Sequence, residues 1–371
     1  MSGALGGRSN PGAGAVVAPD GRIQSIQILR AIAALVVVAY HATVLWHDKG
    51  GAPSNLIWEN GQSGVDLFFA ISGFIILVTG AKMAQKPGAA GKFLELRLIR
   101  LIPLYWLATT AKLVLVMLAP DGTAVNGKPS FWHTVASYLF IPSNNAIGRP
   151  LPVLAVGWTL SYEMLFYLLF ALTMIFALDP LLVIVPLLAG LSLLSLFRTD
   201  SWPTFMTLAN PLLLEFCFGM LVARAFATGK LQRLPTWANV ALVAAGLAYL
   251  FVVPEMGPWT RALGWGVAAA AALAGALSLE RYVKGRLMAG LVLLGEASYA
   301  LYLTHGFVLP AVGIVAAKLH ITGYALGATL VVVSVIASTA VAIATYILLE
   351  RPMTNVLRRY VQGMRKAPVP A

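Results

Sequence analysis

Two residues able to do chemistry, Arg30 and His41, lie eleven positions apart in one apolar segment near the start of the chain. Eleven residues turn an α-helix through slightly more than three full turns. The two side chains are therefore expected on nearly the same face, roughly 16 Å apart along the axis. An ionisable group inside a membrane helix is unfavourable unless it faces protein or a water-filled cavity. The pair therefore predicts a polar site that runs across a bilayer.

A pair of arginines, Arg97 and Arg100, lies in the segment 92-KFLELRLIRLIPLYW-106. We expect both at the cytoplasmic start of a helix, on one face. Guanidinium groups fork onto phosphate, and a helix N-terminus adds free N–H groups and a favourable dipole. The pair indicates a clamp for a phosphorylated ligand, with membrane anchoring by positive charge as the alternative.

Three carboxylates are expected at membrane depth. Glu163, in 156-VGWTLSYEMLFYLLF-170, lies well inside the hydrocarbon and must be paired or functional. Asp66, near the outer boundary, is a second candidate for the site, although an acid in a first turn also favours the helix dipole. Glu215, in mid-membrane, is a candidate structural partner for a buried cation such as Arg30.

The segment 291-LVLLGEASYALYLTHGFVLP-310 is expected to form one helix, on which Glu296 and His305 are nine residues apart and face opposite ways. They should not both line one narrow cavity. For His305 we favour a hydrogen-bonded packing role, with a second site imidazole as the alternative. Glu350, Arg351 and Pro352 are expected to end the last span at the inner face, where the proline stops the helix.

The elements that must position these residues are membrane spans. The chain is 59% hydrophobic and only 11% charged, with a mean hydropathy of +0.82. These values predict an all-α polytopic membrane protein with about ten transmembrane helices. The single Cys217 excludes an internal disulfide and a multi-cysteine metal site, and we expect no metal. The predicted spans are 24–46, 64–81, 101–119, 153–177, 180–197, 206–227, 236–253, 259–279, 289–315 and 324–349.

The positive charges predict the orientation of these spans. Of the 26 lysines and arginines, Lys112 lies within a predicted span and nineteen fall on the side that holds both termini. The positive-inside rule then predicts that both termini are cytoplasmic. The basic excess reflects topology and attraction to anionic lipid, so nucleic acid is not an expected partner. The six charges expected outside are Lys49, Lys128, Arg149, Arg198, Arg261 and Lys318.

These motifs together resemble the bacterial integral-membrane acyltransferase-3 family over roughly residues 24–352. The segments GWTLSYE and NPLLLEF are most similar to the branch that O-acetylates exopolysaccharides. The resemblance implies a transmembrane acyltransferase domain at 23–352. Residues 1–22, rich in Gly, Ala and Pro, are expected to form a flexible cytoplasmic tail, and residues 353–371 a basic cytoplasmic tail. The resemblance rests on Arg30 with His41, 64-GVDLFFAISGF-74, Arg97-x-x-Arg100 with 103-PLYW-106, 156-VGWTLSYEMLFY-167, 295-GEASYALYLTH-305 and 350-ERP-352.

The resemblance implies transfer of an acyl group, usually acetyl, from acetyl-CoA as co-substrate to a hydroxyl of an exopolysaccharide or related glycan. The acceptor would be the polysaccharide or a lipid-linked oligosaccharide, at the bacterial inner membrane. Arg97 and Arg100 would hold the donor's phosphates, while Arg30 would contact the donor or fix a buried carboxylate.

His41 would act as general base, or carry the acyl group covalently. Glu163 and Asp66 would orient the imidazole or grip the acceptor.

Two other functions stay open from the residues. Intramembrane carboxylates and histidines also form proton relays, so a proton-coupled transporter of a sugar or anionic metabolite is the alternative from another class. Within acyl transfer, a small-molecule or lipid acceptor is the other option. The position of His41, about 25 Å from the inner boundary of an upright helix, favours an acceptor that arrives from outside.

Overall fold

Long apolar helices dominate the structure. The computed structural model describes residues 23–50, 52–84, 88–119, 126–199, 201–318 and 324–364. The predicted tail at 1–22 and the end of the predicted basic tail, 365–371, lie outside these residues. The helices are α1 (Gln24–Gly50), α2 (Gly64–Met83), α3 (Ala89–Leu118), α4 (Phe131–Tyr138), α5 (Trp158–Ile175), α6 (Pro180–Leu194), α7 (Leu213–Ala227), α8 (Thr236–Val252), α9 (Pro258–Ser278), α10 (Arg286–Glu296), α11 (Ser298–Lys318), α12 (Tyr324–Thr345) and α13 (Arg351–Met364).

The hydropathy prediction of the spans is confirmed. Within the described residues, nine helical segments are long and apolar enough to cross a membrane. The shorter apolar helix α8 lies where the predicted span 236–253 was expected. The chain is an all-α, multi-pass membrane protein.

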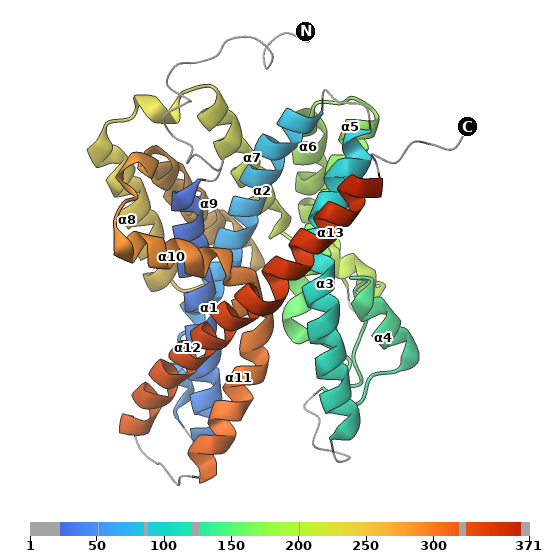
Figure 1. Ribbon diagram of the computed structural model, residues 1–371, viewed down its shortest axis with the longest axis vertical. Helices are drawn as coiled ribbons and strands as arrows, with labels where there is room; N and C mark the ends of the chain where they lie inside the picture. Colours follow the sequence, from blue (N-terminus) through green and yellow to red (C-terminus); the bar gives the residue numbers. More distant parts are fainter. Residues whose placement is uncertain are drawn as a thin grey trace.

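Helix α1 lies inside the bundle and packs against α2, α9, α10, α11 and α12, as the ribbon view illustrates (Figure 1). Next to it, α2 and α7 cross very closely. Gly73 on α2 faces the backbone of Phe216, and Gly219 on α7 faces the backbone of Ala70, so a side chain at either glycine would overlap the other helix. This crossing brings two buried carboxylic residues, Asp66 of α2 and Glu215 of α7, into one region of the bundle.

The prediction of a single helix over 289–315 is wrong in one respect. The helix is interrupted at Ala297, so that α10 ends at Glu296 and α11 begins at Ser298. Figure 1 shows the two helices running in different directions. Gly295 at the end of α10 lies against the backbone of Gln27, so this end packs tightly on α1. The half-turn argument for Glu296 and His305 therefore does not apply, since the two residues are on different helices.

The prediction that Pro352 stops the last helix is also wrong. A π-helical turn, Tyr346–Glu350, joins α12 to α13, and the helix continues to Met364 (Figure 1). The proline is the second residue of α13, beside the turn where the regular hydrogen-bond ladder is already interrupted, so its missing N–H is tolerated. Single π turns often mark functional positions. Here the turn carries Glu350, which is only 7% exposed.

Candidate active site

Arg30 and His41 both face α11, which confirms that they share one face of α1. The Nε and Nη2 atoms of Arg30 donate to Ser298 Oγ at 3.1 and 2.9 Å. The ring of His41 lies against the ring of His305, with 4.9 Å between centroids. Ser298 and His305 are seven residues apart, about two turns of one helix, so one face of α11 meets both side chains.

The hydrogen bond of His41 fixes its tautomer. Its Nδ1 lies 2.9 Å from the carbonyl oxygen of Val37 in the preceding turn. A carbonyl can only accept, so Nδ1 carries the proton and the neutral ring keeps a free lone pair on Nε2. The prediction that Glu163 or Asp66 orients this imidazole is therefore wrong, because a backbone carbonyl does so. His41 is set up as a proton acceptor or nucleophile through Nε2.

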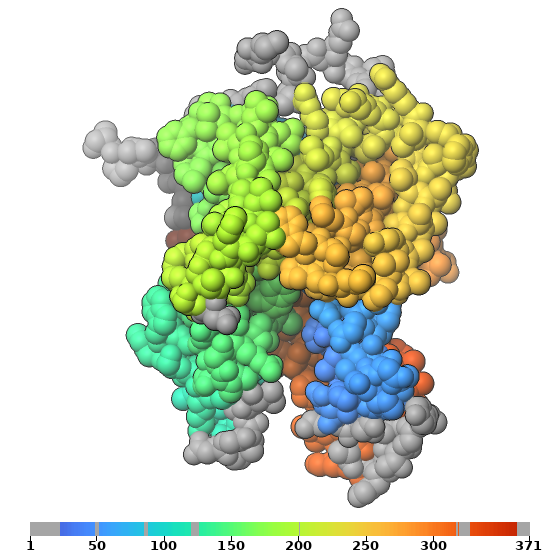
Figure 2. Space-filling view, turned by 180° about the vertical axis from the view of Figure 1, so that it is seen from behind, coloured from blue at the N-terminus to red at the C-terminus, as the bar shows by residue number. Residues whose placement is uncertain are grey.

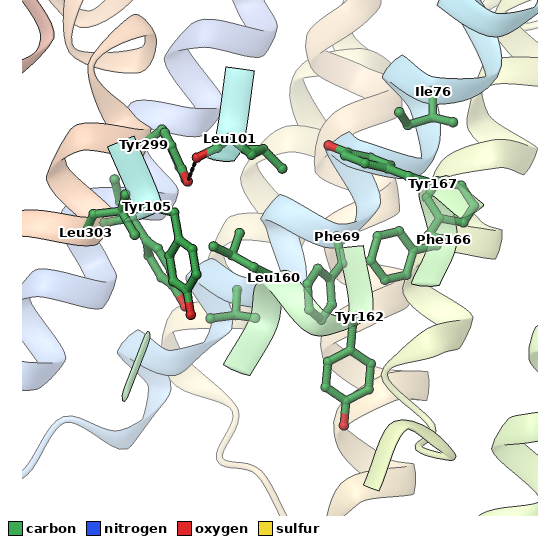
Figure 3. Close-up of a cluster of buried hydrophobic side chains, with 14 of the residues drawn as sticks. Phe69, Ile76, Leu101, Tyr105, Leu160, Tyr162, Phe166, Tyr167, Tyr299 and Leu303 are labelled. Atoms are coloured by element: carbon green, nitrogen blue, oxygen red, sulfur yellow. Dashed lines mark hydrogen bonds between the residues drawn. The ribbon is translucent and has the colours of Figure 1, made fainter. Parts of the chain in front are cut away.

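Four of the six predicted site residues line one cavity of about 90 Å³, the central cavity: Arg30, Arg97, Arg100 and Glu163. Oε1 of Glu163 accepts hydrogen bonds from Ser72 Oγ, at 2.9 Å, and from the Tyr167 hydroxyl. Tyr299, another residue of the cavity wall, donates to the Leu101 carbonyl at 2.7 Å, the bond that is dashed in Figure 3. Three cations and one carboxylate thus converge from α1, α3 and α5.

The arginine pair lies elsewhere than predicted. Helix α3 begins at Ala89, so Arg97 is its ninth residue and no free N–H groups of a helix start lie beside it. Arg97 is enclosed, with Nη2 2.5 Å from Thr79 Oγ1 and its guanidinium over the rings of Phe93 and Tyr167. Arg100 lines the central cavity and also a second one. The helix-terminus part of the phosphate-clamp prediction is therefore wrong.

This second cavity, the basal cavity, lies near the start of α1 and has a volume of about 390 Å³. Four cationic side chains line it, from Lys82, Arg100, Arg351 and Arg358. Glu350 and Glu296 also line it, and Glu296 Oε2 accepts from the Tyr346 hydroxyl at 2.9 Å. Because Arg100 and Ile75 border both cavities, the basal and central cavities adjoin.

Asp66 lies outside the central cavity, in a buried ion pair. Its two carboxylate oxygens accept from Arg261 Nε, at 3.1 Å, and Nη2, at 2.9 Å. Arg261 also reaches Glu255, at 3.3 Å, and packs over the Trp265 ring. The sequence placed Arg261 among outer loop charges, whereas it is only 8% exposed in the first turn of α9.

Glu215, the candidate partner for a buried cation such as Arg30, lies near Asp66 and Arg261. The close crossing of α2 and α7 puts it there. The buried cation near it is therefore Arg261 and not Arg30.

His41 lines a third cavity, the histidine cavity, of about 230 Å³. It borders the central cavity at Val65 and Tyr302. On its other side it shares Trp158 and Arg261 with a fourth, distal cavity of about 310 Å³. The space-filling view shows this face of the molecule hollowed between green and blue segments, the colours of residues near 150 and near 60 (Figure 2). The four cavities form one series from the start of α1 to the opposite end of the bundle.

Comparison with known proteins identifies the family of the chain that contains these cavities. Residues 23–347 match the model of the acyltransferase domain family Acyl_transf_3. The chain belongs to this family. It is also 34% identical, over 298 residues, to the exopolysaccharide production protein ExoZ of Rhizobium meliloti (strain 1021), covering 79% of this chain and 89% of that protein. No solved structure matches the chain.

As an acyltransferase, the protein needs a donor site, a proton acceptor and an acceptor site, and the transporter alternative has no support from its relatives. Sequence reasoning missed three features of the cavity walls: the buried Arg261, the cations of α13 and the hydroxyl donors of Glu163. Arg261 is 195 residues from Asp66, and nothing in the local sequence links them. The spacing of Tyr167, four residues after Glu163, was the one signal that a helical reading could have used.

Proposed function

We propose that the protein is a membrane O-acetyltransferase that moves an acetyl group from acetyl-CoA to a hydroxyl of an exopolysaccharide or its lipid-linked precursor. The observation that carries this proposal is the series of cavities that joins a cation-lined chamber to the free Nε2 of His41. The name of ExoZ, an exopolysaccharide production protein, supports a glycan acceptor, and the family supports the acyl transfer.

The donor would enter the basal cavity from the cytoplasm. Coenzyme A carries several phosphate charges, and Lys82, Arg100, Arg351 and Arg358 offer the matching cations. Apolar side chains such as Phe74 and Phe226 line the same cavity and suit the adenine ring. The pantetheine arm would then pass Arg100 into the central cavity, where Arg30 and Arg97 supply further hydrogen-bond donors.

Glu163 would hold the arm of the donor in the central cavity. Both of its hydrogen bonds from the protein, from Ser72 and Tyr167, fall on Oε1. Oε2 would therefore be the oxygen that accepts from an amide N–H of pantetheine. This role replaces the orientation of His41 that the sequence suggested for Glu163.

The chemical step would take place at His41. Nε2 accepts the proton of a glycan hydroxyl as that oxygen attacks the carbonyl carbon of the thioester. The new C–O bond forms, the C–S bond breaks, and the proton passes from His41 to the leaving thiolate of coenzyme A. The same lone pair would serve the variant in which Nε2 first takes the acetyl group. Release of one equivalent of coenzyme A without acceptor would identify this variant.

The orientation expected from the charges places the basal cavity at the cytoplasmic face of a bacterial inner membrane and the distal cavity at its outer face. Proteoliposomes with the protein in one defined orientation test this directly. Labelled acetyl-CoA is supplied on the basal side. Oligosaccharides are enclosed on the other side; they come from the exopolysaccharide of the organism that makes this protein, after alkali has removed its O-acetyl groups. We expect the oligosaccharide mass to rise by one acetyl group.

His41→Ala protein in the same vesicles is the control for non-enzymatic transfer. Transfer only when donor and acceptor share the basal side would overturn the vectorial part of the proposal. Transfer to lipid but to no glycan would overturn the proposed acceptor class.

A further inference from the structure

The distal cavity has walls of mixed chemistry at the end of the bundle opposite the basal cavity. It lies between the segment after α4, the start of α5, the segment around residue 208 and the start of α9. Its aromatic side chains include Trp158 and Tyr162, and its charged side chains are Arg198, Glu255 and Arg261. Its volume, about 310 Å³, is within the range of about 300–1,000 Å³ in which proteins bind small ligands.

The inner end of this cavity reaches the reacting histidine. Trp158 and Arg261 border both the distal and the histidine cavity, and His41 lines the latter. Arg261 is fixed at this junction, because Asp66 and Glu255 both accept from its guanidinium and its side chain is only 9% exposed. The distal cavity therefore adjoins the cavity of His41 at a side chain that is held in place.

The chemistry of the walls fits a sugar better than a phosphate or an acyl chain. A pyranose presents apolar C–H faces, which suit aromatic rings, and hydroxyls that both donate and accept. Glu255 can accept from such hydroxyls, and Arg198 can donate to them. A phosphate would need excess positive charge, but Asp66 and Glu255 balance Arg261. An acyl chain would leave these charged groups without partners.

We propose that the distal cavity is the acceptor subsite. It would hold one sugar unit of the glycan between Trp158 and Arg198 and direct a hydroxyl past Arg261 to His41. This inference rests on the proposed O-acetyltransferase function and adds the residues that select the acceptor. Arg198 is exposed at the cavity, so its replacement should leave folding intact.

The first test compares two exposed arginines of the same side. Arg198→Gln should raise KM for the de-O-acetylated oligosaccharides at least about tenfold, as expected for loss of a hydrogen bond to a charged group. Its kcat and its KM for acetyl-CoA should stay unchanged. Arg149→Gln is the matched control, because Arg149 is exposed and lines none of the four cavities. Equal acceptor KM values for the two variants would overturn the proposal.

The second test labels an introduced cysteine. The single native cysteine, Cys217, is only 3% exposed and should not react. The thiol of an Arg198→Cys variant is labelled with a membrane-impermeant methanethiosulfonate, with and without the oligosaccharides. We expect the oligosaccharides to slow labelling and acetyl-CoA alone to leave it unchanged. The thiol of an Arg149→Cys variant should be labelled at the same rate throughout.

The outcomes separate this proposal from the proposed function. Normal acetyl transfer by the unaltered protein, without protection of the Arg198→Cys thiol, would overturn the acceptor subsite alone. Failure of the unaltered protein to acetylate any glycan would overturn the proposed function, and the subsite with it.

Discussion

The imidazole rings of His41 and His305 lie side by side between α1 and α11, with centroids 4.9 Å apart and planes inclined by 52°. Each ring directs Nδ1 to a carbonyl one turn back in its own helix, Val37 at 2.9 Å and Leu301 at 3.1 Å. Both Nε2 atoms therefore keep a lone pair. Only His41 lines the histidine cavity, so the two rings have the same local hydrogen bonding but different access to substrate.

His41→Ala is expected to lower kcat by about 10²–10⁴-fold, the contribution typical of a positioned general base. Binding of coenzyme A should stay unchanged, because no other cavity is altered. Turnover by purified protein and donor affinity by calorimetry check both statements. His47→Ala is the control, since His47 bonds to the Ala52 carbonyl and lines none of the four cavities. Near-native turnover of a well-folded His41→Ala protein would rule out the base.

His305→Phe is expected to keep turnover within about threefold, because a phenyl ring preserves the ring contact with His41 and the cavity wall. His305→Ala should instead lower the thermal stability, since His305 is only 1% exposed and its removal leaves a void. Turnover and melting temperature of both variants provide the measurement. A loss of turnover in His305→Phe as large as in His41→Ala would give His305 Nε2 a part in the proton transfer.

Arg358→Gln should weaken coenzyme A binding by about tenfold, because this arginine lines the basal cavity where the phosphates are proposed to lie. Its neighbour Arg359 is exposed but lies outside that cavity, so Arg359→Gln is a matched control of equal charge change. The salt dependence of the affinity should weaken for Arg358→Gln and stay unchanged for Arg359→Gln. Arg100→Lys should also weaken binding, because it keeps the charge but loses the fork. Equal affinities of Arg358→Gln and Arg359→Gln would contradict this assignment.

Glu163→Gln should weaken coenzyme A binding and lower the transfer activity. The amide oxygen can still accept from Ser72 and Tyr167, so the packing of the central cavity should survive. The amide nitrogen that replaces Oε2 cannot accept from an N–H of pantetheine, and the negative charge beside Arg30 and Arg97 in that cavity is lost. Turnover, donor affinity and melting temperature are measured together. A fall in melting temperature with normal turnover per folded molecule would make Glu163 a structural residue.

Asp66→Asn is expected to lower the free energy of unfolding by roughly 3–5 kcal/mol, because it leaves Arg261 buried with a weaker partner. Thermal unfolding in detergent checks the loss. The double variant Asp66→Asn/Arg261→Gln should be less destabilised than the sum of the single variants, since it removes the uncompensated charge. Full stability of Asp66→Asn with loss of turnover would instead return Asp66 to the catalytic role that the sequence suggested.

Hydropathy predicted most of the fold, because a span is a local property of about twenty residues. The shared face of Arg30 and His41 was predictable for the same reason. The start of α3 could not be predicted from hydropathy, because Lys92, Glu95 and Arg97 give its first turns a polar sequence. Their helical conformation extends a long helix beyond the apolar segment.

The site was only partly predictable, because its pairs are distant in sequence. Sequence spacing says nothing of which arginine meets Asp66, and 195 residues separate it from Arg261. The role expected for Glu163 failed on a local detail: a histidine in a helix can satisfy Nδ1 with its own backbone. No carboxylate is then needed to hold the ring.

The junction between the central and histidine cavities has a consequence for the energetics of the cell. Tyr302 stands at this junction, its hydroxyl bonded to Val156 and its ring in edge contact with Phe68. A continuous file of water past this point would let protons run down the membrane potential, which releases about 2.3 kcal/mol per charge at 100 mV. If the acetyl group takes the proposed route, Tyr302 and Val65, which border both cavities, must also keep the membrane insulated between turnovers.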